Sequence, residues 1–146
     1  MKPIAKIYML IIIFSIIFDI FISHIPQVIA EDNDWSSAGN LLKQKGNYTG
    51  AIAAYNKALG IDPNYVNAWE GKGWALNELG NYTQAISYLN KALEMDSKHV
   101  DALIFKGQSL YGLGNHTGAK YYFDSAFELD PSNKLLKRIY NNSTKE

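Results

Sequence analysis

Side chains that could do chemistry are few in this 146-residue sequence, and no set of them has the spacing of an active site. The chain has no cysteine, which excludes disulfides, cysteine-ligated zinc, iron–sulfur clusters and thiol catalysis. Its histidines, His24, His99 and His116, are dispersed, and there is no HExxH, GxSxG or P-loop motif. We therefore predict no catalytic residue, no metal site and no cofactor.

The remaining polar side chains have structural explanations. The G-K-G triplet at 71–73 is part of no phosphate-binding loop, because no strand is expected before it. The carboxylates of Glu70, Glu78 and Glu94 fall where we expect solvated helix positions. None of these groups predicts a reaction.

The chain carries a row of N-x-[ST] triplets, the acceptor motif for N-linked glycans. Three of them share a G-N-x-T setting, and two more overlap near the C-terminus. The candidate glycosylation sites are Asn47, Asn81, Asn115 and Asn142. The alternative is that duplication copied the triplet, because asparagine is common after glycine at such turns and threonine caps a following helix.

The first 30 residues differ from the rest, since 21 of them are apolar. Lys2 and Lys6 precede an apolar run over residues 7–22, and Val28 and Ala30 supply small residues before an acidic cluster. A basic region, an apolar region and small residues at a cut site are typical of a secretory signal peptide. We expect residues 1–30 to be that signal, cleaved after Ala30.

An uncleaved signal anchor over residues 7–29 is the alternative. The run is slightly shorter than the ~20 residues that span a bilayer comfortably, and Asp19 at mid-membrane would cost roughly 2.5–3.5 kcal/mol. In both interpretations the lysines stay inside. We therefore expect the rest of the chain to be secreted, or extracytoplasmic and membrane-anchored.

Charge gives no reason to expect a nucleic-acid partner. The 14 basic and 14 acidic side chains balance to a net charge of zero. The chain therefore has no overall attraction to nucleic acid or to an anionic membrane surface.

Beyond residue 30 the sequence repeats every 34 residues without insertion. Trp35 and Trp69 share a column whose third member is Leu103. Other columns recur at Gly39, Gly73, Gly107; Gly46, Gly80, Gly114; Ala51, Ala85, Ala119; and Ala58, Ala92, Ala126. We place the repeat domain at residues 31–132, and the three repeats at about 32–65, 66–99 and 100–133.

Each repeat is expected to fold as two helices. In the first, Gly46 ends one helix in a left-handed conformation, Thr49 caps the next, and Asp62-Pro63 closes it. Gly39 and Ala51 face each other and let the paired helices approach closely. The same logic predicts helices near 67–79, 83–94, 100–112 and 117–129.

Residues 133–146 are expected to form a short capping helix followed by a disordered tail from residue 141. Leu135, Leu136 and Ile139 make one narrow apolar stripe with basic residues opposite. Such a helix would cover the open end of a stack of repeats.

The repeated columns resemble the tetratricopeptide repeat (TPR) family. The first repeat supplies the signature residues Trp35, Gly39, Ala51, Tyr55, Ala58 and Pro63, and the other two repeats match it in part. Departures include Lys72 and Lys106 at a leucine column and Ser97 at a proline column. The resemblance covers residues 33–131. It implies an all-α, right-handed α-solenoid of three helix-turn-helix repeats whose concave face binds peptides or proteins.

The resemblance also implies which columns of each first helix line that groove. The candidates are Asn33, Asn40, Asn67, Trp74, Asn77, Asp101, Gln108 and Tyr111, with Ser36, Lys43, Glu70 and Ile104 in the same columns. Side-chain amides can both donate to and accept from a peptide backbone, and Trp74 and Tyr111 are candidate aromatic anchors. The alternative is that these two rings pack against neighbours.

One subclass of the family binds the C-terminal carboxylate of a chaperone tail through lysine, asparagine or arginine in two of these columns. Only Asn40 fits here, so we predict no chaperone-type carboxylate clamp. The sequence predicts a non-enzymatic scaffold that binds a partner protein or peptide in the groove, outside the cytoplasm. A membrane-tethered assembly factor and a glycan- or cell-wall-binding protein stay open as alternatives.

Overall fold

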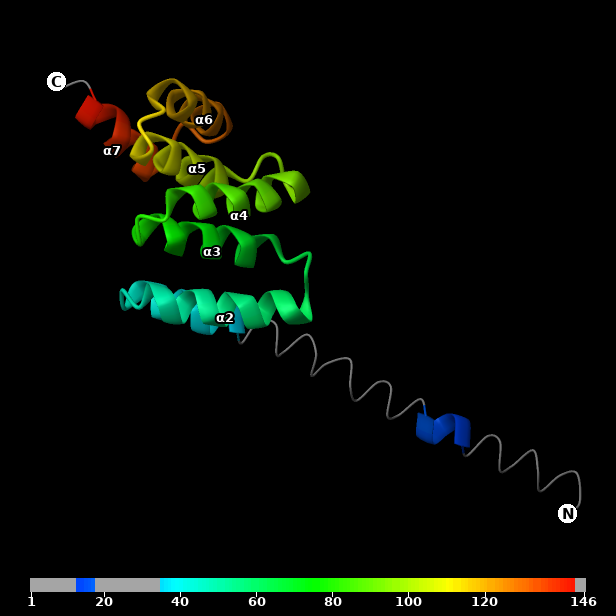
Figure 1. Cartoon of the computed structure of the whole chain (residues 1–146). Helices are drawn as coiled ribbons and strands as arrows, with labels where there is room; N and C mark the ends of the chain where they lie inside the picture. The colour runs from blue at the N-terminus through cyan, green and yellow to red at the C-terminus, as the bar shows by residue number, and fades with distance from the viewer. Residues whose placement is uncertain (1–12, 18–34, 144–146) are drawn as a thin grey trace, which may run out of the picture.

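The computed structural model describes residues 13–17 and 35–143, and all regular structure in these ranges is helical. Residues 35–44 are helical and pair with α2 (Tyr48–Ile61). The chain continues through α3 (Val66–Glu78), α4 (Tyr82–Met95), α5 (Val100–Gly112), α6 (His116–Leu129) and α7 (Lys134–Ser143). These helices stack in chain order (Figure 1), which confirms the predicted all-α solenoid with a terminal helix. The predicted bounds of α3 to α6 differ from the observed bounds by one residue at most.

The predicted signal peptide or anchor lies outside the described residues, apart from an exposed helical turn at 13–17. The cleavage site after Ala30 and the groove candidate Asn33 are also outside them. Across 13–17 and 35–143, no helix has both the length and the hydropathy to cross a membrane.

Glycine ends each first helix, as the sequence predicts. Gly46, Gly80 and Gly114 have φ angles of 73°, 75° and 79°, a region that favours glycine. In the first repeat the amide of Gly46 donates to Lys43 O at 3.0 Å, and the amide of Asn47 donates to Leu42 O at 2.9 Å. This pair of hydrogen bonds is the Schellman motif, and it recurs at the other two turns.

Asparagine, rather than threonine, caps each second helix. Asn47 Oδ1 accepts from the amide of Gly50 at 2.9 Å, and Asn115 Oδ1 accepts from Gly118 at the same distance. Thr49 lies inside α2, so its predicted role as the cap is wrong. The cap falls at Asn47 because the Schellman turn ends there and leaves its side chain beside the first free amides.

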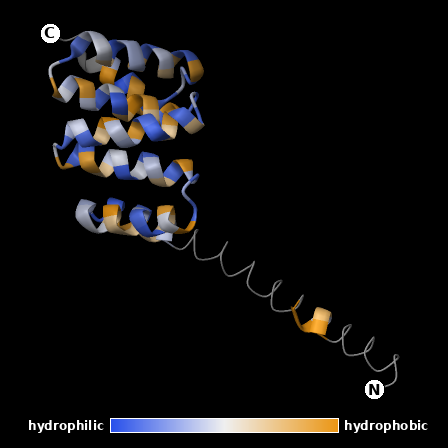
Figure 2. Cartoon of the chain, turned by 45° about the vertical axis from the view of Figure 1, so that its right-hand side comes forward, coloured by the Kyte–Doolittle hydropathy of each residue, from blue (hydrophilic) through white to orange (hydrophobic). Residues whose placement is uncertain are grey.

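The core of the first repeat is built around one ring. Tyr55 is fully buried, and a Cβ added to Gly39 or to Gly71 would lie 2.5 Å from that ring. Gly39 therefore packs against Tyr55, which lies one turn after Ala51 on α2. Figure 2 shows hydrophobic and hydrophilic residues alternating around each helix, as expected for helices with one buried side.

The lysines that depart from the family signature lie over aromatic rings. Lys72 Nζ is 3.8 Å from the ring centroid of Tyr88, and Lys106 Nζ is 4.2 Å from that of Tyr122. In the first repeat, the lysine column holds Ala38 and the tyrosine column holds Ala54. Each repeat therefore has both the lysine and the tyrosine, or neither. The departures are thus paired changes that form cation–π contacts.

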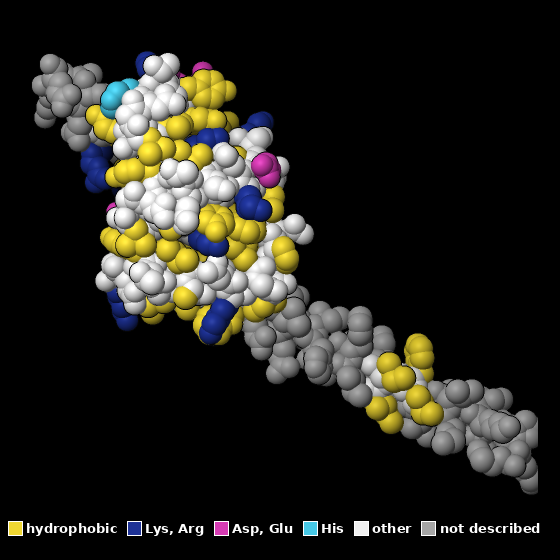
Figure 3. Space-filling view, viewed as in Figure 1, with side chains coloured by type: hydrophobic (Ala, Val, Ile, Leu, Met, Phe, Trp, Pro, Cys, Tyr) yellow, Lys and Arg dark blue, Asp and Glu magenta, His cyan; other side chains and the backbone are white. Residues whose placement is uncertain are grey.

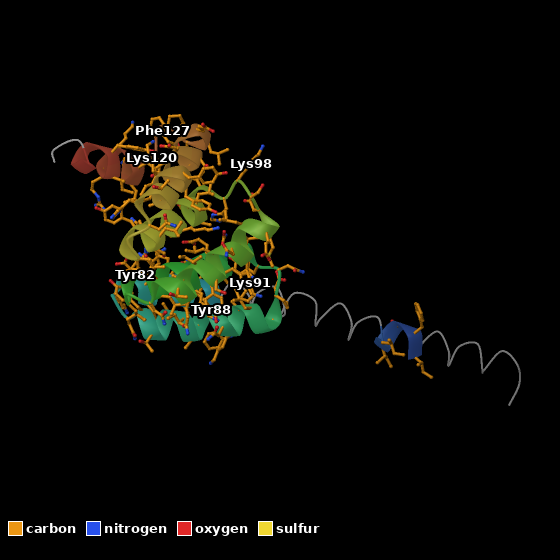
Figure 4. The ribbon with its side chains drawn as sticks, turned by 45° about the horizontal axis from the view of Figure 1, so that its top comes forward. Tyr82, Tyr88, Lys91, Lys98, Lys120 and Phe127 are labelled. Carbon is orange, nitrogen blue, oxygen red and sulfur yellow. The ribbon has the colours of Figure 1, made fainter. Side chains whose placement is uncertain are left out.

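A second pair of columns makes the same kind of contact. Lys57 Nζ lies 3.8 Å from the ring of Trp35, and Lys91 Nζ lies 4.9 Å from that of Trp69. Trp69 also stacks on Tyr88 at 5.8 Å. Tyr88 and Lys91 project from α4 (Figure 4), and basic side chains interrupt the hydrophobic ones on the visible face in Figure 3.

The last helix packs on α6 through its apolar stripe. Leu136 is fully buried, and Leu135, Ile139 and Tyr140 pack around it. Tyr140 donates to Asp124 Oδ1 at 2.7 Å and sits edge-on to Phe127 at 5.5 Å. The helix continues to Ser143, so residues 141–143, which we expected in the disordered tail, are helical.

Candidate functional site

The first helices of the three repeats lie side by side. Lys43 Nζ, from the helix at 35–44, is 4.3 Å from the ring centroid of Trp74 in α3 and 5.6 Å from that of Phe105 in α5. Ser109 Oγ in α5 donates to Asn77 Oδ1 in α3 at 2.9 Å. We use the name first-helix face for the surface formed by Asn40, Lys43, Asn67, Glu70, Trp74, Asn77, Asp101, Gln108 and Tyr111.

Trp74 is a half-buried side chain in the middle repeat of this face. Its ring meets Tyr48 edge-on at 5.4 Å and Phe105 at 6.3 Å. The ammonium of Lys43 also lies over the indole, so three side chains contact Trp74. Trp74 therefore packs against its neighbours, and its side chain is only half-buried.

Three predicted asparagines already have partners within the molecule. Asn40 Oδ1 accepts from the hydroxyl of Tyr55 at 2.8 Å, and Asn77 Oδ1 accepts from Ser109. Asn67 Oδ1 lies 3.1 Å from His99 Nε2. These bonds hold the amides in position and leave fewer acceptors for a peptide backbone.

His99 serves as the cap of α5, a role that sequence reasoning missed. Its Nδ1 accepts from the amide of Ala102 at 3.3 Å. That bond assigns the imidazole proton to Nε2, which then donates to Asn67. Its place just before a helix could have suggested the cap from the sequence.

Tyr111 is the most open aromatic side chain of the first-helix face. It is 57% exposed, and its ring meets His116 edge-on at 4.6 Å. Asp101 is exposed and Gln108 is half-buried. Ser36 and Ile104 share columns with these residues but are buried, so the expectation that every member of those columns faces a groove is wrong.

Glu70 differs most from its expected environment. We expected a solvated carboxylate, but the side chain is half-buried and its Oε1 is enclosed without a hydrogen-bond partner. Burial raises the pKa of Glu70 to about 7; nearby Lys43 opposes this rise, and Asp101 adds to it. The pKa of the Tyr55 hydroxyl is raised first by burial and then by the negative charge of Glu70.

The sequon asparagines of the repeats are exposed at the turns between paired helices. Each accepts a hydrogen bond from a backbone amide through Oδ1; the bond at Asn81 is the longest, 3.4 Å. Asn142 lies in α7 by its backbone, and its side chain is not described. In the described part of the chain, no three His, Asp or Glu side chains are grouped to hold a metal ion.

Comparison with known families identifies the class of this molecule. A tetratricopeptide repeat profile matches residues 36–98 and again residues 72–134, which together span more than half of the chain. The chain belongs to the tetratricopeptide repeat family. A comparison with curated protein sequences gives no match.

Solved structures agree with this fold. The TPR domain of Arabidopsis OM64 superposes with a TM-score of 0.74 at 23% identity, covering 82% of this chain and 98% of that one. The first TPR domain of human RPAP3 gives 0.72 at 22%, covering 78% and 90%. A further similar structure, the first TPR of Spaghetti (RPAP3), was solved bound to the HSP90 peptide SRMEEVD; it gives 0.72 at 22%, covering 80% and 92%.

Proposed function

We propose that this protein is a non-enzymatic interaction scaffold that binds an extended segment of a partner protein along the first-helix face. The observation that carries the proposal is the arrangement of that face, which combines an exposed Tyr111, a half-buried Trp74 packed against Tyr48, and a hydrogen-bonded amide at Asn40. Family membership and the peptide-bound structure of similar fold support it. A preformed face binds a segment without first ordering its own side chains, which reduces the cost of association.

We also propose that this face has no chaperone-type carboxylate clamp. In the two columns that supply such a clamp, the residues are Ser36, Asn40, Glu70, Trp74, Ile104 and Gln108. The set has one suitable amide and no cation, and the carboxylate of Glu70 would repel a terminal carboxylate.

A pull-down with matched tyrosine variants tests the proposal. Partner proteins are crosslinked to the chain in native cells and recovered with it. Tyr111→Ala should reduce the amount recovered, because Tyr111 is the exposed anchor of the first-helix face. Tyr121→Ala removes a ring that is 66% exposed on α6, a second helix, and should leave capture intact. Equal capture by both variants would contradict the proposed face.

We further propose that residues 1–30 place the repeats outside the cytoplasm. The support is the order of Lys2 and Lys6, an apolar run and an acidic cluster. N-terminal sequencing of the native protein should begin at Glu31 if the leader is cleaved. Carbonate-resistant membrane association with an intact N-terminus would instead support the anchor, and the molecule would then gather partners at a membrane.

Glycosylation of Asn47, Asn81 and Asn115 is part of the same proposal. The support is their exposure at equivalent turns. Glycan mass attached at these three sites should be lost in a Thr49→Ala, Thr83→Ala, Thr117→Ala variant. Replacing the threonines is the sharper test, because replacing the asparagines would also remove the helix caps.

A further inference from the structure

The middle of the first-helix face holds a carboxylate that forms no ion pair, although the charge of Lys43 is nearby. Glu70 Oε1 is enclosed and accepts no hydrogen bond. Lys43 is the nearby cation, but its ammonium lies over the rings of Trp74 and Phe105. Across residues 35–143 the one ion pair is Lys120 with Asp124, so no basic side chain is paired with Glu70.

The other elements around Glu70 do not compensate its charge. From α2, the hydroxyl of Tyr55 donates to Asn40. From α5, Asp101 adds a second negative charge, and His99, the cap of α5, is hydrogen-bonded to Asn67. A buried polar atom normally has a partner, because leaving it unpaired costs free energy.

We propose that the first-helix face selects a partner segment with a lysine or arginine side chain, whose cationic group pairs with Glu70 beside Asp101. This inference rests on the proposed function and specifies the chemistry of the partner. Trp74 lies four residues after Glu70 on the same side of α3, so an apolar neighbour of the bound cation would have a ring to contact.

Binding of a cation should depend on pH through Glu70. In the protein without a partner, the Glu70 carboxyl has a pKa of about 7, so it is half protonated near neutral pH. A bound cation favours the ionised form. From this pKa we expect affinity to rise by roughly tenfold between pH 6 and pH 8.

The experiment is a selection from a displayed library of random 12-residue peptides on the full chain in mild detergent. Four proteins are compared: wild type, Glu70→Gln, Tyr111→Ala to identify peptides that need the first-helix face, and Glu78→Gln as the control. Glu78 is an exposed carboxylate at the end of the same helix. We expect wild type and Glu78→Gln to enrich peptides with a lysine or arginine, and Glu70→Gln to lose this preference.

The affinity of each protein for a selected peptide is then measured by fluorescence anisotropy at about pH 6 and about pH 8. We expect the pH dependence in wild type and none in Glu70→Gln, which should also bind roughly tenfold more weakly at pH 8 because a charge-assisted contact is lost. Circular dichroism checks that each variant is folded.

Two failures can be told apart. If no peptide depends on Tyr111 for binding, the proposed function is wrong and this inference falls with it. If Tyr111-dependent peptides show no excess of lysine or arginine, or select equally on Glu70→Gln, the scaffold function stands and the cationic partner is wrong.

Discussion

At the residue scale, one tyrosine ring sets the separation of three helices. Tyr55 in α2 fills the space left by Gly39 in the first helix and by Gly71 in α3. Its hydroxyl reaches Asn40, so the buried oxygen has a partner. There is no room for one more methyl group against this ring.

Adding a methyl group at Gly71 should therefore destabilise the fold. The new Cβ of Gly71→Ala would lie 2.5 Å from Tyr55 Cζ, and we expect a loss of about 1–3 kcal/mol from overpacking. Gly60→Ala is the matched control, because nothing lies within 4 Å of its Cβ position in α2. The control should gain about 0.5–1 kcal/mol through helix propensity. Urea unfolding followed by circular dichroism measures both; equal shifts would contradict the packing argument.

The start of each second helix depends on a single side chain at the element scale. Asn47, Asn81 and Asn115 each cap a helix that begins one residue later. They follow the glycine that ends the preceding helix, so one Gly-Asn pair closes one helix and opens the next.

Removing the capping asparagine should lower the free energy of unfolding more than removing the threonine of the same triplet does. We expect Asn47→Ala to destabilise by about 1 kcal/mol, since an amide of the first turn loses its acceptor. Asn81→Ala should cost less, because its bond to Gln84 is 3.4 Å, against 2.9 Å at Gly50. Thr49→Ala should leave the cap intact. Thermal unfolding of unglycosylated protein compares the three, and a larger loss for Thr49→Ala would overturn the assignment.

The terminal helix is attached partly through one carboxylate. Asp124 accepts from Lys120 and from Tyr140, both at 2.7 Å, and these hydrogen bonds lower its pKa. A carboxylate with a lowered pKa stabilises the fold fully above its ordinary pKa of about 3.9. That contribution is lost as the pH falls through the lowered value.

We therefore expect α7 to loosen from α6 in acid, below about pH 4. Amide chemical shifts of α7, followed by NMR from neutral pH downwards, should show a transition in wild type. Asp124→Asn should lack that transition. A transition of the same size in the variant would assign the effect to another group.

Stability should be uneven across the whole molecule, because each repeat of a solenoid contacts only its neighbours. Two leucines allow a matched test, since Leu89 in α4 and Leu136 in α7 are both fully buried. Leu89 belongs to the middle of the stack, and Leu136 belongs to its last element.

Hydrogen exchange should separate these two positions. Leu136→Ala should speed exchange in α7 and leave α3 and α4 unchanged, because α7 can detach alone. Leu89→Ala should lower protection throughout, with a cost of about 2–5 kcal/mol. Uniform loss of protection in both variants would show that the stack unfolds as one unit.

The sequence by itself determined the architecture. The 34-residue period, the glycine after each first helix and the alanine columns predicted the helices of the second and third repeats to within one residue. The glycine turns and the buried faces can be recognised locally, because each depends on residues within a few positions along the chain.

The environments of the candidate site residues were decided only by the tertiary structure. Lys43 reaches Trp74, Ser109 bonds Asn77, and Glu70 is enclosed without a partner. The observed partners lie about one repeat away in sequence and become neighbours only when the helices stack. Periodicity predicts which column a side chain occupies, whereas its burial and its charge depend on what the next repeat places against it.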